Sequence, residues 1–211
     1  MRHAWNAYKD ELIGRLPFLR ETLNTGVSAA DIAAAEQVIG VSFPESLKAL
    51  YLDSNGDNEE AACGMIMGFH FLTLEQVVSE CQHWSGIAQD KDLNDAGSFS
   101  SKPEGCIKCR YADPKWIPIC ADGGGNFLGV DLDPDVNGKS GQVINFGRDE
   151  HDKAVLAEDL DSFFERLVRI INSPDFFIGD FEGEEVVCLC TDDVEESKFL
   201  TDYLKSEDSV K

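Results

Sequence analysis

The sequence predicts a mixed fold in which α-helices accompany an antiparallel β-sheet. Three short runs rich in Val, Ile, Phe and Trp lie close together, at residues 116–120, 127–132 and 142–146. Turn-forming Gly, Asp, Asn and Pro residues separate them, which is the pattern of an antiparallel meander. Apolar residues at helical spacing occur on both sides of this region, so helices should precede and follow the meander.

The N-terminal third should be helical. Residues 3–23 predict one or two short helices, interrupted at Pro17. Ser28-Ala-Ala-Asp31 is typical of a capped helix start, and Gly40 suits the end of that helix. A further helix should begin at Pro44 and end at Asn55-Gly56.

The stretch before the meander is expected to alternate between loop and regular structure. The acidic residues 57–60 predict a surface loop, and residues 65–72 predict a strand. Thr73-Leu-Glu-Gln76 is a capping box that opens a helix. Residues 86–105 are polar and rich in Gly, Ser and Asp, so they predict a long loop.

Residues after the meander should return to the sheet and then form a strong helix. Residues 152–157 predict a strand, and residues 160–171 carry an apolar face that ends before Ser173-Pro174. Residues 175–211 contain 12 Asp and Glu against 3 Lys, yet they keep apolar faces. We therefore expect a main domain at residues 1–174 and a small acidic β-then-α extension at 175–211, docked on it.

Charge is the strongest global feature. The 211-residue chain has 18 Lys and Arg against 40 Asp and Glu, a formal net charge of −22. Such a charge repels nucleic acid and anionic membranes and attracts a basic protein partner. No apolar run approaches the ~20 residues of a membrane helix, and the N-terminus lacks a signal-peptide core. These observations predict a soluble, cytoplasmic protein.

One turn in the meander resembles part of a calcium loop. Asp133-x-Asp135-x-Asn137-Gly138 copies the first half of an EF-hand loop. Ile144 occupies the twelfth position, where that loop needs a bidentate Glu, and the flanks predict strands rather than helices. Turn formation is the better explanation, and we predict no metal there.

The seven cysteines are scattered and do not form a secreted disulfide framework. Cys106-Ile-Lys-Cys109 has the spacing of one half of a zinc site, but a second matching pair is missing. A zinc-binding or redox protein that uses Cys106 and Cys109 therefore stays an alternative. No cofactor is predicted.

No catalytic arrangement stands out. Asp122-Gly-Gly-Gly-Asn126 is rich in glycine but lacks the Gly-Lys-Ser/Thr ending of a phosphate loop. Neither Gly-x-Ser-x-Gly nor His-Glu-x-x-His occurs, and the four histidines show no pairing with a nucleophile. The sequence predicts a protein that is not an enzyme.

Two sets of motifs resemble those of a known family. Glu36-x-x-Ile39-Gly40-x-x-Phe43-Pro44, with Leu47, Tyr51 and Asn55-Gly56, resembles the N-terminal signature of the SUKH superfamily. That superfamily contains Smi/Knr-type cell-wall-synthesis regulators and bacterial immunity proteins. Its central signature is similar to four segments here: Trp116-Ile-Pro-Ile119, Asp122–Asn126, Asp131-Leu-Asp133-Pro134 and Gly141-Gln-Val-Ile144. The helix with Phe163 and Phe164 resembles its closing helix, and the resemblance covers about residues 25–172.

The resemblance implies an α+β fold with helices packed on a mostly antiparallel sheet, and binding rather than catalysis. Our leading hypothesis is an immunity protein that neutralises a toxin domain, possibly a nuclease with a basic groove. A signalling or scaffold regulator of the cell-wall-synthesis type is the alternative. The predicted partner contacts are Asp57, Glu59, Glu60, Asp122, Asn126, Asp131, Asp133 and Asp135.

Overall fold

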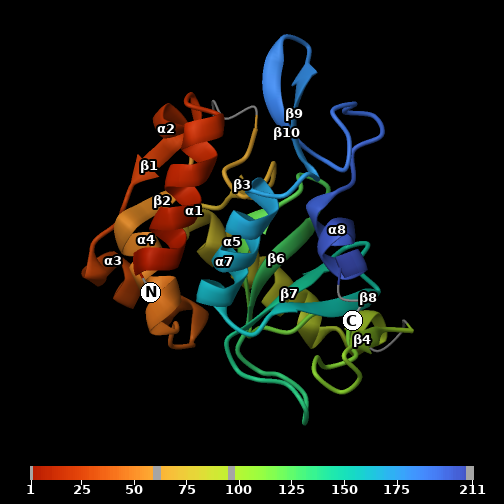
Figure 1. Cartoon of the computed structure of the whole chain (residues 1–211). Helices are drawn as coiled ribbons and strands as arrows, with labels where there is room; N and C mark the ends of the chain where they lie inside the picture. The colour runs from red at the N-terminus through yellow and green to blue at the C-terminus, as the bar shows by residue number, and fades with distance from the viewer. Residues whose placement is uncertain (1, 59–62, 95–97, 208–211) are drawn as a thin grey trace.

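The computed structural model describes residues 2–58, 63–94 and 98–207 (Figure 1). Glu59 and Glu60, two of the predicted partner contacts, lie outside the described residues. Among the described residues, no helix has the length and apolarity needed to cross a bilayer. The helices are α1 (Arg2–Arg15), α2 (Leu19–Thr22), α3 (Ala29–Ile39), α4 (Glu45–Asp53), α5 (Leu74–Gln89), α6 (Lys91–Asn94), α7 (Leu160–Ile171) and α8 (Leu200–Glu207).

The strands form one large sheet and two small antiparallel pairs, β1–β2 and β9–β10. The order in the large sheet is β3-β5-β6-β7-β8-β4, and only the β4–β8 pair is parallel. The α+β fold with a mostly antiparallel sheet is therefore confirmed. The strands are β1 (Leu23–Thr25), β2 (Ser54–Asp57), β3 (His70–Phe71), β4 (Ser100–Lys102), β5 (Trp116–Ala121), β6 (Asn126–Asp131), β7 (Gln142–Gly147), β8 (Asp152–Ala157), β9 (Phe176–Phe181) and β10 (Glu184–Leu189).

The predicted meander is the centre of the sheet. β5, β6 and β7 pair in sequence order, and every residue of β7 is buried. Burial of consecutive residues means that both faces of this strand are covered, because side chains alternate between faces. Gly129 of β6 lets β5 approach closely, since an added Cβ would lie 2.2 Å from the carbonyl oxygen of Ile117.

Local capping explains why the helices could be predicted. The Ser28 hydroxyl accepts a hydrogen bond from the N–H of Asp31, and Gly40 ends α3 in the left-handed conformation at φ 82°. Thr73 and Gln76 form the expected capping box at the start of α5. Each cap satisfies backbone groups that the first and last turns of a helix leave unpaired. Helix α4 ends at Asp53, earlier than predicted, because Asn55-Gly56 belongs to β2.

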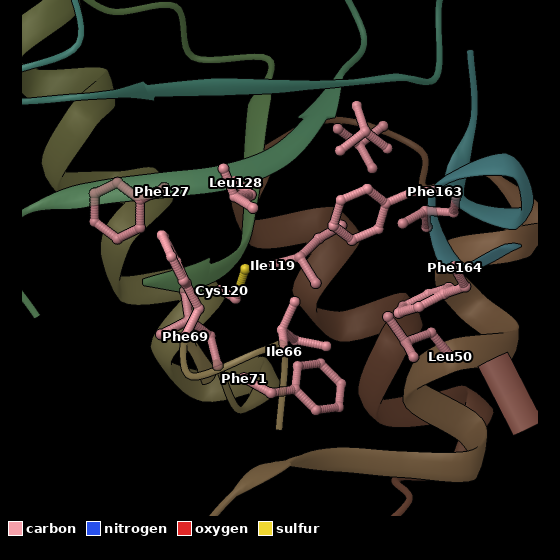
Figure 2. Packing of buried hydrophobic residues seen from close by; sticks show 14 of the residues in the cluster. Leu50, Ile66, Phe69, Phe71, Ile119, Cys120, Phe127, Leu128, Phe163 and Phe164 are labelled. Atoms are coloured by element: carbon pink, nitrogen blue, oxygen red, sulfur yellow. The ribbon is translucent and has the colours of Figure 1, made fainter. Parts of the chain in front are cut away.

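Aromatic side chains join the helices to the sheet. The ring of Trp5 in α1 lies 5.5 Å from the ring of Phe71 and 5.1 Å from that of Phe164 in α7. Figure 2 shows Leu50 of α4, Phe164 of α7 and Phe71 of β3 gathered in one buried cluster. Aromatic pairs of this kind contribute about 0.5–1.5 kcal/mol each beyond the burial of their area. The N-terminal helices are thus part of the core.

The acidic C-terminal segment is folded and packs on the sheet. β9 and β10 form a hairpin that stands out at one end of the molecule, and α8 lies beside β8 (Figure 1). The guanidinium of Arg166 donates hydrogen bonds to the carbonyl oxygens of Leu156 in β8 and Leu204 in α8, both at 2.7 Å. The predicted docking of an extension is observed, but its first strand, β9, was not predicted.

Three local predictions are wrong. Asp57 is buried at the end of β2, where a surface loop was expected, because its carboxylate binds two backbone N–H groups. Only His70–Phe71 of the predicted 65–72 strand pairs with the sheet. The predicted 86–105 loop contains the end of α5, then α6 and β4, apart from residues 95–97, which lie outside the described residues.

Candidate functional site

A groove of about 670 Å³ separates residues 63–69 from the C-terminal segment. We call residues 63–69 the loop wall. The opposite side, the C-terminal wall, consists of Phe181, residues 186–189, residues 194–195 and residues 197–200. Asp122, in the turn between β5 and β6, also lines the groove. The volume lies within the range of protein ligand sites.

Asp57 and Tyr8 fix the loop wall from behind. Oδ2 of Asp57 accepts hydrogen bonds from the N–H groups of Met65 at 3.0 Å and Phe71 at 2.7 Å. The Tyr8 hydroxyl donates to the carbonyl oxygen of Met65 and accepts from the N–H of Met67. These bonds satisfy the backbone of a buried loop that contributes few residues to the sheet.

The loop wall is tightly folded. Gly64 pairs with Gly68 in a short bridge, and a Cβ on Gly64 would lie 2.0 Å from the carbonyl oxygen of Phe69. Met67 occupies the left-handed region at φ 51°, which few non-glycine residues adopt. The backbone of Met67 is therefore strained, and the hydrogen bonds of the surrounding loop keep it in this conformation.

The C-terminal wall is held by its own network. Ser197 Oγ accepts a hydrogen bond from the N–H of Leu189 at 2.8 Å, and the N–H of Lys198 donates to the carbonyl oxygen of Leu189. The Tyr203 hydroxyl donates to Asp175 at 2.8 Å, which ties α8 to the start of the hairpin. The 190–199 connection is thus fixed against β10.

Two phenylalanines of the C-terminal wall face solvent. Phe181 is 56% exposed and Phe199 is 70% exposed, whereas Leu189 and Leu200 of the same wall are buried. Single exposed apolar residues are ordinary on protein surfaces. Two exposed phenylalanines that line one apolar groove are more informative, because such surfaces mark interaction sites.

The Cys63 thiol at the groove is not activated as a nucleophile. Burial raises the pKa of the Cys63 thiol, although a backbone hydrogen bond from Val187 acts in the opposite direction. A thiol with a raised pKa carries little of the thiolate that nucleophilic catalysis needs. The described geometry of this thiol supports binding rather than covalent chemistry.

Asp122 and Asn126, two predicted contacts, meet in one turn. Oδ1 of Asp122 accepts from the N–H groups of Gly124 and Asn126, and Oδ2 accepts from Nδ2 of Asn126 at 2.8 Å. Asp122 is exposed and lines the groove. The carboxylate therefore organises its own turn while presenting charge at the groove.

Asp131, Asp133 and Asp135 lie in a different part of the structure. Asp131 is fully buried, and burial raises its pKa to about 6. It accepts hydrogen bonds from the N–H of Asp133 and from Gln142. Asp133 forms ion pairs with Lys108 and Lys115, and the N–H of Asp135 donates to Cys106. These acids hold the turn after β6 against the loop that contains Cys106 and Lys108, and they do not line the groove.

Among the described residues, Cys106 and Cys109 have no further ligands of the kind that a zinc site needs. The Cys106 sulfur contacts the carbonyl oxygen of Asn137 at 3.5 Å, and Cys109 is exposed. Within residues 2–58, 63–94 and 98–207, no three His, Cys, Asp or Glu side chains are arranged to hold a metal ion.

The sequence interpretation missed the aromatic residues of the groove. The extension was expected to end in a helix with an apolar face, but Phe199 precedes α8 and is exposed. Phe181 lies in β9, which was not predicted. A signal for β9 was present, because Glu182-Gly183 between two apolar runs is typical of a two-residue hairpin turn. Both residues have the positive φ that this turn requires, 55° and 92°.

Comparison with known proteins identifies the family. The profile of the SMI1 / KNR4 family (SUKH-1) matches residues 26–166. This span contains the N-terminal and central signatures and most of α7. The chain belongs to the SMI1 / KNR4 family. The predicted resemblance is confirmed, and the loop wall and Asp122 fall within the matched region, whereas the C-terminal wall lies beyond it.

Similar proteins of the SMI1 / KNR4 family are fungal regulators. "Cell wall assembly regulator SMI1" of Saccharomyces cerevisiae is 31% identical over 196 residues, which cover 78% of this chain and 39% of the yeast protein. "Cell wall biosynthesis/cell cycle regulator smi1" of Schizosaccharomyces pombe is 32% identical over 65% of this chain and 29% of its own length. "Glucan synthesis regulatory protein" of Neurospora crassa is 27% identical over 80% of this chain and 38% of its own.

The chain thus spans less than half the length of these three relatives. Their names describe regulators of cell-wall and glucan synthesis, and none describes an immunity protein. The predicted bacterial immunity role receives no support from them. The alternative, a regulatory protein of the cell-wall-synthesis type, is the one that the relatives favour.

Proposed function

We propose that this chain is a non-enzymatic, protein-binding domain that takes part in regulating cell-wall synthesis. The observation that carries the proposal is the regulatory designation shared by relatives that align with 65–80% of the chain. The groove supports a binding role, because its walls combine apolar side chains, exposed phenylalanines and a thiol whose pKa is raised.

The proposed partner is a basic protein. A net charge of −22 attracts a positively charged surface and speeds its association at low ionic strength. The same charge disfavours direct contact with a phosphate backbone. In this proposal the domain binds a protein partner and catalyses no reaction.

A domain exchange tests the proposal. The segment of the budding-yeast regulator that aligns with this chain is replaced by the chain itself in a strain that lacks the native gene. We expect the chimera to restore growth under cell-wall stress and normal glucan content, whereas an empty vector does not. A chimera that accumulates as folded protein but leaves the strain as sensitive as the deletion would contradict the proposed function.

A further inference from the structure

The groove presents apolar side chains that nothing in the described chain covers. Phe181 and Phe199 expose 56% and 70% of their surface on the C-terminal wall, whereas Met67, on the loop wall opposite, is only 4% exposed. Phenylalanine and methionine are adaptable, apolar anchor points, and methionine suits grooves that accept an amphipathic segment. The exposed phenylalanines of the groove therefore favour contact with apolar side chains of a partner.

The segment that supplies the C-terminal wall is strongly acidic, and Glu195 of this segment lines the groove beside Lys198. Residues 180–196 contain no Lys or Arg, and eight exposed carboxylates, here called the acidic rim, lie within them. Within the described part of the chain, no ion pair involves any of these eight groups. The acidic rim consists of Asp180, Glu182, Glu184, Glu185, Asp192, Asp193, Glu195 and Glu196.

We infer that the groove binds a basic amphipathic segment of the partner protein. Its apolar side chains contact Phe181 and Phe199, and its Lys and Arg side chains pair with the acidic rim. This inference rests on the proposed function and names the binding surface for it. It commits to one class of ligand, because exposed phenylalanines and carboxylates without ion pairs, on one segment, suit a partner segment that has both apolar and basic side chains.

Other occupants fit the surface less well. A second copy of this chain would bring two acidic rims together, and like charges at an interface oppose association. A nucleic acid or an anionic bilayer carries the same sign of charge as the rim. A neutral apolar peptide would bury the phenylalanines but leave the carboxylates without counter-charges.

A designed peptide provides the probe. A fluorescein-labelled peptide of 18 residues, built from Leu and Lys with one apolar face, is titrated with the full chain and followed by fluorescence anisotropy. We expect saturable binding that the double variant Phe181→Ala/Phe199→Ala weakens about tenfold or more, as is typical when buried aromatic anchors are truncated. Val136→Ala is the matched control, since Val136 is 89% exposed and does not line the groove.

The charge contribution is tested separately. Glu195→Gln/Glu196→Gln should weaken binding of the Lys peptide and reduce its dependence on salt. Glu75→Gln/Glu165→Gln removes the same charge from exposed positions outside the groove and should change both much less. A peptide with Glu in place of every Lys should not bind. Circular dichroism of each variant confirms that it is folded.

Three results would overturn the inference. The first is undiminished binding of the Lys peptide to the phenylalanine double variant, and the second is equal binding of the Glu peptide. The third is a dimer of the wild-type chain in light scattering that is monomeric in the same double variant. If these occur while the yeast chimera restores growth, the groove assignment fails and the proposed function stands. If the peptide binds as expected while the chimera does not restore growth, the groove binds such segments but the regulatory proposal fails.

Discussion

Asp57 holds the loop wall through a carboxylate that has almost no contact with water. Burial raises its pKa to about 6, while hydrogen bonds from Met65 and Phe71 and the nearby His70 act in the opposite direction. An unfolded Asp has a pKa of about 3.9, so the folded protein holds this proton more tightly. The resulting stabilisation is fully present below about pH 4 and is lost as pH rises through about 6.

Asp57→Asn should remove this pH dependence. The Asn Oδ1 can still accept both backbone hydrogen bonds, but the side chain cannot ionise. Between about pH 4 and about pH 8, the free energy of unfolding of the wild type should fall by roughly 2 kcal/mol relative to the variant. Urea titrations across this pH range measure the difference. The variant His70→Gln in the same series shows how much of the pH dependence comes from the His70 imidazole. Parallel curves for wild type and Asp57→Asn would contradict the assignment.

The family signature can now be explained residue by residue. Glu36 accepts a hydrogen bond from the N–H of Phe43 at 2.6 Å and pairs with Lys48, so it joins α3 to α4 across Gly40. Such short-range contacts are visible in sequence spacing. The role of Asp57 is not, because its hydrogen-bond partners lie 8 and 14 residues away in a loop without a repeating pattern.

At the level of elements, Arg166 anchors α8 to the sheet. Its side chain leaves α7 and reaches one carbonyl oxygen in β8 and one in α8. A buried guanidinium that satisfies two carbonyl groups is costly to remove, because the carbonyls are left without a donor. The extension therefore depends on a residue of the main domain for its position.

Arg166→Met should lower the free energy of unfolding by about 2–4 kcal/mol, since two charge-assisted hydrogen bonds are lost and their acceptors stay buried. Arg169→Met is the control, because Arg169 is exposed on the same helix. Denaturation in urea measures both variants. Near-equal stabilities of the two variants would show that Arg166 does not anchor α8.

The elements differ in how far the sequence determines them. Capping boxes and a 3.6-residue apolar period are local, so α3, α5 and α7 were predictable. β4 consists of Ser100–Lys102, which carries no β-type residue, and it exists because it pairs with β8, 52 positions away. The groove could not be predicted either, since its two walls are brought together only by the docking of the C-terminal segment.

For the whole molecule, the net charge of −22 acts against compactness, because like charges repel more strongly when the chain is folded. Salt shortens the range of this repulsion to about 8 Å at physiological ionic strength. The acidic rim concentrates part of the charge in one region. Screening of this charge by salt should raise the stability of the fold and weaken the binding of a basic partner.

Raising sodium chloride from about 20 mM to about 500 mM should therefore raise the melting temperature, by about 2–4 °C for each kcal/mol of repulsion relieved. The same titration should weaken binding of the Lys peptide. Scanning calorimetry and anisotropy on one preparation measure both effects. A melting temperature that falls with salt would show that the internal ion pairs outweigh the repulsion.

The groove is assembled from two stretches that differ in how deeply they are buried. Residues 63–69 pack into the hydrophobic core, so most substitutions there would impair folding. The side chains of the 181–199 stretch that are exposed lie outside the core, so we expect substitutions there to cost less stability. The 181–199 stretch, which includes Phe199 and Glu195 as well as half of the hairpin, is accordingly the part to transplant when redirecting the domain to a new target.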